Sequence, residues 1–223
     1  MNKYFLRLFP LLILVVSCSS NTKALKSVDL GLSVKWASAN LGATAPEERG
    51  QYYAWGELKE KMTYNWTDYV FCNDGNANKL TKYCPEKKPE FWDDNGTPDD
   101  LLILNKEDDV ANSILGGNWR IPTDEEWAEL FLNCTWTWEE INGVKGYSIV
   151  SNINHNSIFL PAVGWKEDNS LTFEGVWGYY WSSTVNPFNP DNAKCTVLNE
   201  YRNGTARGAV YRYYGLSIRP VTD

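Results

Sequence analysis

The sequence predicts an α+β fold, because two helical segments stand among many short strand-like ones. The strand-like runs are rich in β-branched and aromatic residues and are separated by Gly, Asn and Asp turn signals. The helical segments instead have apolar residues at helical spacing. No repeat or Pro-rich linker follows residue 27, so residues 28–223 are expected to form one domain.

The strands are predicted from short apolar runs that turn residues interrupt. Most are five or six residues long, which is the usual length of a strand in a globular protein. The predicted strands are Leu32–Ala37, Gln51–Trp55, Gly146–Val150, Ser157–Leu160, Gly178–Ser182, Ala193–Leu198 and Leu216–Val221.

The best-specified element is a helix that begins after Thr123. Thr123 can accept a hydrogen bond from the first turn while Glu126 reaches back to it, which is a capping box. Acidic residues crowd that first turn, where the helix dipole favours them. A second helix is predicted over Lys106–Leu115, whose apolar residues form a stripe behind an acidic first turn.

Long loops are expected within residues 51–104. Two stretches there, residues 73–81 and 93–100, are polar and rich in turn residues. Aromatic side chains are expected to anchor these loops, because their large apolar area can replace regular structure as a source of burial. The expected anchors are Phe71, Tyr83, Phe91 and Trp92.

The first 17 residues are typical of a signal peptide. Lys3 and Arg7 precede an apolar run over residues 8–16, which is too short to span a bilayer and has the usual length of a secretory segment. The run ends in Val-Val-Ser and then Cys18, as in a lipoprotein cleavage site. An ordinary signal peptide with an incidental cysteine is the alternative.

The expected organisation is therefore a lipoprotein signal peptide over residues 1–17, a lipidated tether over residues 18–27, and the domain. Cys18 is the predicted lipidation site, and several acyl chains would anchor the protein stably in a membrane. We expect the protein to be an outer-membrane lipoprotein of the cell envelope.

The charge of the chain excludes some partners. Its formal net charge is −7, and no cluster of Lys and Arg stands out. Nucleic acid is therefore not expected as a partner, and the membrane is expected to be contacted only through the lipid. The 11 Trp and 13 Tyr are unusual and suit both a buried core and a binding surface.

Four cysteines follow Cys18 in the chain: Cys72, Cys84, Cys134 and Cys195. An exported protein can form disulfides, and four cysteines allow three pairings. The sequence does not choose among these pairings. A bridge between the two that are nearest in sequence and free buried thiols both remain open.

Several ordered motifs carry a resemblance to a known family. The segment 116–127 reads GGNWRIPTDEEW, and four others read VDLGLSVKW (28–36), SIFLPA (157–162), GYYWSS (178–183) and GLSIRPV (215–221). Together they resemble the Fibrobacter succinogenes major paralogous domain and related Bacteroides-type lipoproteins. That group belongs to the C-type-lectin-like superfamily, which also includes the formylglycine-generating enzymes.

The resemblance implies a C-type-lectin-like domain with two helices, a small mixed or antiparallel sheet and long irregular loops. The chain departs from the enzymes, because they use paired cysteines near the C-terminal end of the domain, whereas only Cys195 stands there in this sequence. The only histidine, His155, lies in a polar turn. The protein is therefore not expected to be an enzyme, and no cofactor is expected.

A weak calcium candidate lies in an acidic loop. Asp93, Asp94, Asp99 and Asp100 supply the oxygen ligands that calcium prefers, but their spacing is not that of an EF-hand. The usual interpretation of such a loop is a solvated turn. The sugar-ligating triplets of calcium-dependent lectins are absent, so the resemblance does not imply calcium-dependent sugar binding.

The predicted binding surface lies near the C-terminus, where Tyr, Asn, Arg and Gly alternate as they do on adaptable recognition surfaces. In some relatives the corresponding segment is diversified to vary ligand choice, and a variable binding face is therefore one alternative. A hairpin whose Tyr and Arg merely cover the sheet is the other. The candidate ligand-binding residues are Asn186, Phe188, Asn189, Asn192, Tyr201, Arg202, Asn203, Arg207, Tyr211, Arg212 and Tyr213.

The sequence thus predicts a lipid-anchored, non-catalytic protein that binds a protein or a glycan. Two alternatives stay open. One is a relative of the formylglycine-generating oxidoreductases, and the other is a structural component of a surface assembly.

Overall fold

The computed structural model describes residues 25–93, 98–201 and 204–223. The chain is mostly β, with 37% strand, 12% helix and three sheets that include a half-barrel. The expected α+β, C-type-lectin-like fold is therefore wrong. The physical reason is that the helical segments are short, while strands that were not predicted build much of the sheet structure.

The largest sheet has five strands in the order β10-β9-β8-β6-β7. All neighbouring pairs are antiparallel except β6 and β8, which meet in parallel at Gly164 and Gly178. The strands are β6 (Val163–Glu167), β7 (Ser170–Glu174), β8 (Trp177–Val185), β9 (Asn192–Asn199) and β10 (Gly204–Tyr211).

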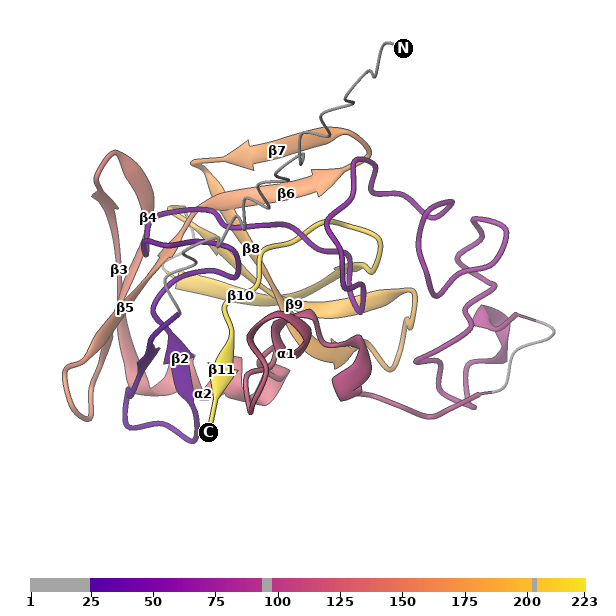
Figure 1. Cartoon of the computed structure of the whole chain (residues 1–223), viewed down its shortest axis with the longest axis horizontal. Helices are drawn as coiled ribbons and strands as arrows, with labels where there is room; N and C mark the ends of the chain where they lie inside the picture. The colour runs from indigo at the N-terminus through magenta and orange to yellow at the C-terminus, as the bar shows by residue number, and fades with distance from the viewer. Residues whose placement is uncertain (1–24, 94–97, 202–203) are drawn as a thin grey trace, which may run out of the picture.

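Two smaller antiparallel sheets flank the large one. One has the order β3-β4-β5 and the other β1-β2-β11. In Figure 1, β3, β4 and β5 lie together at one end of the long axis, and β2 lies beside β11 near the C-terminus. Their strands are β3 (Cys134–Ile141), β4 (Val144–Ser151), β5 (Ser157–Pro161), β1 (Ser27–Val28), β2 (Lys35–Ala37) and β11 (Val221–Thr222).

The helices are α1 (Val110–Leu115) and α2 (Asp124–Asn133), with 3-10 turns at Pro89–Phe91 and Lys106–Asp108. The capping box at the start of α2 is confirmed, with Thr123 and Glu126 bonded in both directions. The predicted helix over Lys106–Leu115 is divided, because Asp109 is extended and caps α1 by accepting from two backbone N–H groups.

Four of the seven predicted strands hold in full. The runs in β4, β5, β8 and β9 are confirmed, and Leu32–Ala37 contributes only its last three residues, as β2. The predicted strands Gln51–Trp55 and Leu216–Val221 are wrong as continuous strands. They meet at an isolated bridge between Tyr53 and Leu216, and β11 begins only at Val221.

Most of residues 51–104 form loops, as predicted, and Figure 1 places many of them at the end of the molecule opposite β3, β4 and β5. A separate apolar cluster holds them, centred on Tyr52, Tyr64, Tyr69 and Leu80. Phe71, Phe91 and Trp92 pack against it, and Tyr83 is buried in the neighbouring cluster, so the expected aromatic anchors are confirmed.

The four cysteines of the described chain are free and buried. Burial raises the pKa of the Cys84 and Cys195 thiols to about 12 and that of Cys134 to about 11. The thiolate, which is the reactive form, is therefore disfavoured at neutral pH. In the described part of the chain, none of the helices has the length and apolar character needed to cross a membrane.

Candidate ligand-binding site

Tyr211 and Tyr213, two of the predicted ligand-binding residues, lie together at the end of β10 and just beyond it. Their rings are nearly parallel, with an interplanar angle of 13° and centroids 5.6 Å apart. Trp66 meets both rings edge-on, at 5.9 and 5.0 Å, and Tyr214 does so at 5.9 and 4.8 Å. Tyr211 is 41% exposed, so this cluster reaches solvent.

A second aromatic group stands on three strands of the large sheet. Trp165 of β6 stacks on Phe173 of β7 at 5.2 Å and meets Tyr179 of β8 edge-on at 4.7 Å. Trp177 stacks on Tyr179 at 6.2 Å. Phe173 is 52% exposed and the other three side chains are half-buried. Neighbouring strands therefore present a continuous row of rings.

Glu167 joins the two groups. It follows Trp165 by two residues in β6, so both side chains point to the same face of the strand. The hydroxyls of Tyr213 and Tyr214 both donate to Glu167 Oε1, at 3.3 and 3.1 Å. The carboxylate thus fixes the tyrosines of the 211–214 segment beside the tryptophan of β6.

Backbone pairing holds the same arrangement. Lys166 and Gly215 exchange hydrogen bonds of 2.8 and 2.9 Å, which places the segment after β10 next to β6. A Cβ on Gly215 would lie 2.6 Å from the Tyr64 ring, so only glycine allows this approach. We define the joined surface as the aromatic stripe: Trp66, Trp165, Phe173, Trp177, Tyr179, Tyr211, Tyr213 and Tyr214.

Three tyrosine hydroxyls of the stripe, those of Tyr179, Tyr213 and Tyr214, are neutral near physiological pH. Burial raises the pKa of Tyr179 to about 12. Burial also raises the pKa of Tyr213 and Tyr214, and the nearby carboxylate of Glu167 acts in the same direction. These groups can therefore serve as hydrogen-bond donors and acceptors, but not as bases.

The backbone at Phe173 is held in an uncommon conformation. Its φ is +57°, a left-handed value that residues other than glycine rarely adopt. Gly164, on the paired strand β6, is also left-handed, and a Cβ there would lie 2.1 Å from the Thr172 carbonyl oxygen. The β6–β7 hairpin thus accepts strain and directs a half-exposed phenyl ring onto Trp165.

Four predicted binding residues lie at the other end of β8, three in the turn before β9 and the fourth, Asn192, as the first residue of β9. Asn186 donates its N–H to Asn192 O at 3.0 Å, and its side chain accepts from Phe188 N at 3.1 Å. Asn192 N donates in turn to Asn189 O. The asparagines therefore shape the turn, and Phe188, 74% exposed, lines a separate hollow of about 550 Å³ with Leu102 and Pro187.

The predicted arginines are engaged in the fold. Arg212 is fully buried, donates to the carbonyl oxygens of Lys82 and Tyr83, and lies over the Trp55 ring at 5.0 Å. Its prediction as a surface ligand-binding residue is therefore wrong, because it fastens the 82–83 loop. Arg207 is exposed but forms an ion pair with Asp124 at the start of α2.

Tyr201 is 80% exposed in the turn after β9. Because Asn199 pairs with Trp177, this turn lies at the Trp177 end of the stripe. Arg202 and Asn203 lie outside the described residues, as do Asp94, Cys18 and the whole predicted signal peptide.

The acidic residues of the weak calcium candidate bond instead to the loop that carries them. Asp99 accepts from the N–H groups of Tyr83 and Cys84, at 2.7 and 3.2 Å, and Asp100 accepts from Glu86 N at 2.8 Å. Asp93 is buried and accepts from the side-chain amide of Asn73. No group of three possible ligands for a metal gathers within the described ranges.

The groups with catalytic potential are dispersed. His155 is exposed in the β4–β5 turn, as expected for a loop residue. Cys195 is buried in β9, in an apolar cluster that contains none of the other three cysteines. The described structure therefore brings no second thiol into the same cluster.

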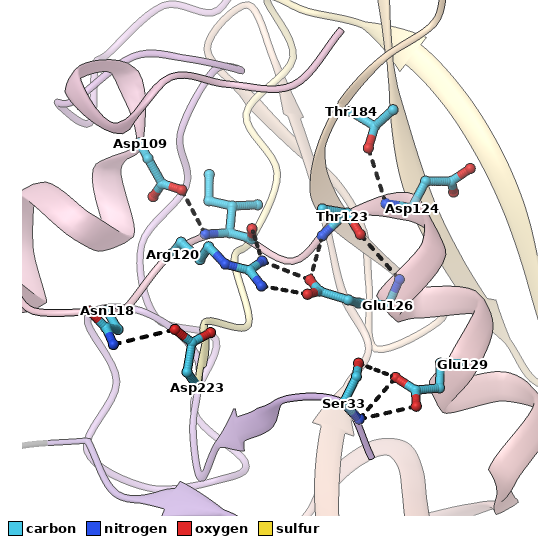
Figure 2. Close-up of polar contacts among 11 residues, drawn as sticks. Ser33, Asp109, Asn118, Arg120, Thr123, Asp124, Glu126, Glu129, Thr184 and Asp223 are labelled. Carbon is cyan, nitrogen blue, oxygen red and sulfur yellow. Dashed lines mark hydrogen bonds and ion pairs between the residues drawn. The ribbon is translucent and has the colours of Figure 1, made fainter.

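The GGNWRIPT segment is structural. Arg120 forms a two-pronged ion pair with Glu126, whose carboxylate also accepts from Thr123 N at 2.8 Å, as Figure 2 shows. Asp109 joins the start of α1 to this segment by accepting from Ile121 N at 2.8 Å. The residues that best define the motif thus fix how α1 and α2 meet.

Five members of the stripe lie outside the C-terminal segment for which binding was predicted: Trp66, Trp165, Phe173, Trp177 and Tyr179. The signal available in the sequence was alternation, because Trp165 and Glu167, like Trp177 and Tyr179, stand two residues apart and so share a strand face. Comparison of the chain with models of protein families, with curated proteins and with solved structures finds no match.

Proposed function

We propose that the protein is a lipid-anchored, non-catalytic protein of the cell envelope that binds a protein or a glycan through the aromatic stripe. The observation that carries the proposal is the stripe itself. Eight aromatic rings from five separate segments lie on one surface, and Phe173 and Tyr211 are 52% and 41% exposed there.

Rigid aromatic side chains suit binding, because they supply large contact area at a small cost in conformational entropy. In the stripe each ring is held by at least one neighbouring ring, and the tyrosines of the 211–214 segment are also held by Glu167. Such a preorganised surface loses little further freedom when a ligand binds.

The oxidoreductase alternative has less support. It requires reactive thiols, whereas burial raises the pKa of Cys195 to about 12 and the other cysteines belong to different apolar clusters. The neutral hydroxyls of Tyr179, Tyr213 and Tyr214 and the tyrosine-bound Glu167 also favour recognition over acid-base chemistry.

The lipid anchor predicts a specific labelling result. When cells grow with an alkyne-tagged fatty acid, the wild-type chain is expected to incorporate the label and Cys18→Ser to lose it, because the sulfur of Cys18 would carry a lipid. Cys134→Ser is the matched control and should retain the label, since that thiol is buried in the domain. Equal labelling of wild type and Cys18→Ser would contradict the anchor.

The stripe predicts a binding result. The chain from residue 18 onward, made lipid-free by Cys18→Ser, is expected to bind intact cells. The double variant Trp165→Ala/Tyr213→Ala should reduce the bound fraction at least about tenfold, because it removes one ring from each half of the stripe.

Phe188→Ala is the control for this measurement, since it removes an exposed ring that lies outside the stripe. Circular dichroism of each variant verifies that the fold is kept. Unchanged cell binding by the double variant would remove the proposed site and would favour the alternative of a structural surface component.

A further inference from the structure

We propose that the ligand of the aromatic stripe is a linear neutral glycan built of pyranose units with equatorial hydroxyls. This inference rests on the proposed function and names the chemical class of its ligand. The inference rests on a row of oriented aromatic rings that lies beside the carboxylate of Glu167. Among the described residues, this surface has no unpaired cation.

The rings at the two ends of the row are oriented to receive a flat apolar face. Phe173 stacks on Trp165 at an interplanar angle of 27°, and Tyr211 stacks on Tyr213 at 13°. Phe173 is 52% and Tyr211 41% exposed, and further rings hold them edge-on: Trp177 meets Phe173, and Trp66 and Tyr214 meet Tyr211. Each exposed ring is thus a fixed platform.

A pyranose whose hydroxyls are all equatorial carries its axial C–H bonds on its two faces. These weakly positive C–H groups are complementary to the negative face of an aromatic ring. An axial hydroxyl interrupts that face and places a polar group against the ring. The platforms therefore favour the gluco and xylo configurations over the galacto configuration.

Glu167 supplies a matching polar contact between the platforms. Both tyrosine hydroxyls bond to its Oε1, and no contact within the described residues uses its Oε2. A carboxylate oxygen accepts strongly from hydroxyl donors, and sugars present several of these. The tyrosine oxygens of the same segment add acceptors within reach of neighbouring hydroxyls.

The charge around the stripe disfavours anionic ligands. Lys166 alternates with Trp165 and Glu167 along β6, and its ammonium lies instead over the Tyr52 ring at 5.1 Å and near Glu60. Arg212 is buried, and Arg207 is paired with Asp124. The carboxylate of Glu167 would repel uronic acids and phosphates.

A peptide is also less well matched. The centre of the stripe, formed by Trp165, Trp177 and Tyr179, stands on β6 and β8, which are paired on both sides, while Phe173 and Tyr211 belong to the edge strands β7 and β10. An extended peptide binds best along an unpaired strand edge, where backbone groups supply the affinity. The centre of the stripe offers side chains alone, which suits a ligand made of C–H faces and hydroxyls.

The test measures binding of four hexasaccharides by calorimetry, with the lipid-free Cys18→Ser chain from residue 18 onward. Cellohexaose and xylohexaose are the expected ligands. A β-1,4-linked galactohexaose and a hexagalacturonate are the axial and anionic controls. We expect both controls to bind at least about tenfold more weakly than cellohexaose.

Variants then locate the binding. Phe173→Gly should weaken cellohexaose binding at least about tenfold, because it removes the platform while glycine accepts the left-handed backbone. Phe173→Tyr keeps the ring and should restore most of the affinity. Glu167→Gln should weaken binding several-fold, and Phe188→Ala should leave it unchanged.

Two outcomes separate this inference from the proposed function. If no hexasaccharide binds, or if hexagalacturonate binds best, while Trp165→Ala/Tyr213→Ala still abolishes binding to cells, the neutral glycan is overturned and the stripe remains a binding surface for another class of partner. If that double variant binds cells as well as the wild type, both proposals are overturned.

Discussion

Replacing Arg219 by alanine is expected to destabilise the protein by at least about 3 kcal/mol. Arg219 is fully buried and its guanidinium donates to Asn40 Oδ1, Ala37 O and Phe159 O, at 2.9, 3.0 and 2.7 Å. Each buried acceptor left without a donor costs about 1–3 kcal/mol. Domains are stable by only about 5–15 kcal/mol, so the loss is large.

The location of these acceptors explains why the effect is global. Ala37 belongs to β2 and Phe159 to β5, so a single side chain ties two different sheets to the C-terminal segment. Burial lowers the pKa of Arg219 to about 10, which shows that the fold bears a cost for enclosing this charge. That cost is accepted because no neutral side chain presents three such donors in one plane.

The measurement is denaturant unfolding followed by tryptophan fluorescence. Arg219→Lys should recover part of the stability, because an ammonium can reach some of the acceptors but not all. Arg49→Ala is the matched control, since its ion pair with Glu174 is on the surface, and it should change the free energy of unfolding by less than about 0.5 kcal/mol. An unfolding midpoint for Arg219→Ala equal to that of the wild type would contradict the assignment.

Stability is expected to fall steeply above pH 10. Tyr53 and Tyr180 are buried, and burial raises the pKa of each to about 12. In the unfolded chain a tyrosine ionises near pH 10. Each such tyrosine therefore contributes stability that is complete below pH 10 and is lost as the pH rises from 10 to 12.

These two tyrosines determine how steeply the free energy of unfolding is expected to fall with pH. Each lost proton corresponds to about 1.4 kcal/mol per pH unit, so the pair gives a decline of about 3 kcal/mol per pH unit at its steepest. Burial raises the pKa of Tyr52 and Tyr64 as well, which adds to the decline. Arg219 acts in the opposite direction, because burial lowers its pKa, but the four tyrosines together outweigh this one arginine.

The test is the free energy of unfolding by urea at pH 8, 10 and 11. Tyr53→Phe keeps the ring and removes the ionisable group, so the variant should lose less stability between pH 10 and 11 than the wild type does. A stability that stays constant up to pH 11 would show that the unfolded chain does not ionise ahead of the folded one.

The local chemistry of the chain was more predictable than its fold class. The start of α2 could be predicted because the capping box is a contact between neighbours, Thr123 and Glu126. The strand predicted at Gln51–Trp55 failed because residues 52–55 are buried while the N–H groups of Gln51, Tyr53 and Trp55 bond singly to residues 41, 216 and 212. A buried segment that forms no continuous ladder of backbone hydrogen bonds has the same apolar sequence pattern as a strand.

The α+β interpretation failed for a related reason. β3, β6, β7 and β10 were not predicted, although β3 alternates Trp136 and Trp138 with Thr and Glu. Without these strands the two helices seemed to be a larger share of the fold than they are. Whether such a run forms a strand depends on tertiary contacts, because it must pair with a segment that is distant in the sequence.

The candidate site was predictable only in part. Tyr211 and Tyr213 follow from composition, since Tyr beside Asn and Arg is typical of recognition surfaces. Trp66, which meets both rings, stands far away in the sequence, and the pairing of Lys166 with Gly215 brings Trp165 next to their segment. Arg212 was misassigned because a charged residue between two tyrosines gives no sign in the sequence that it points inward.

The burial of the four described thiols determines how the protein responds to reducing, oxidising and alkylating reagents. Its fold relies on no covalent cross-link between the described cysteines, so a reducing agent removes nothing that holds it together. Oxidants and alkylating reagents meet the sulfur atoms only when the surrounding packing opens. Cys134, Cys195 and the pair Cys72 and Cys84 belong to three different apolar clusters. The rate at which each cysteine is modified therefore reports how often its own cluster opens by local unfolding.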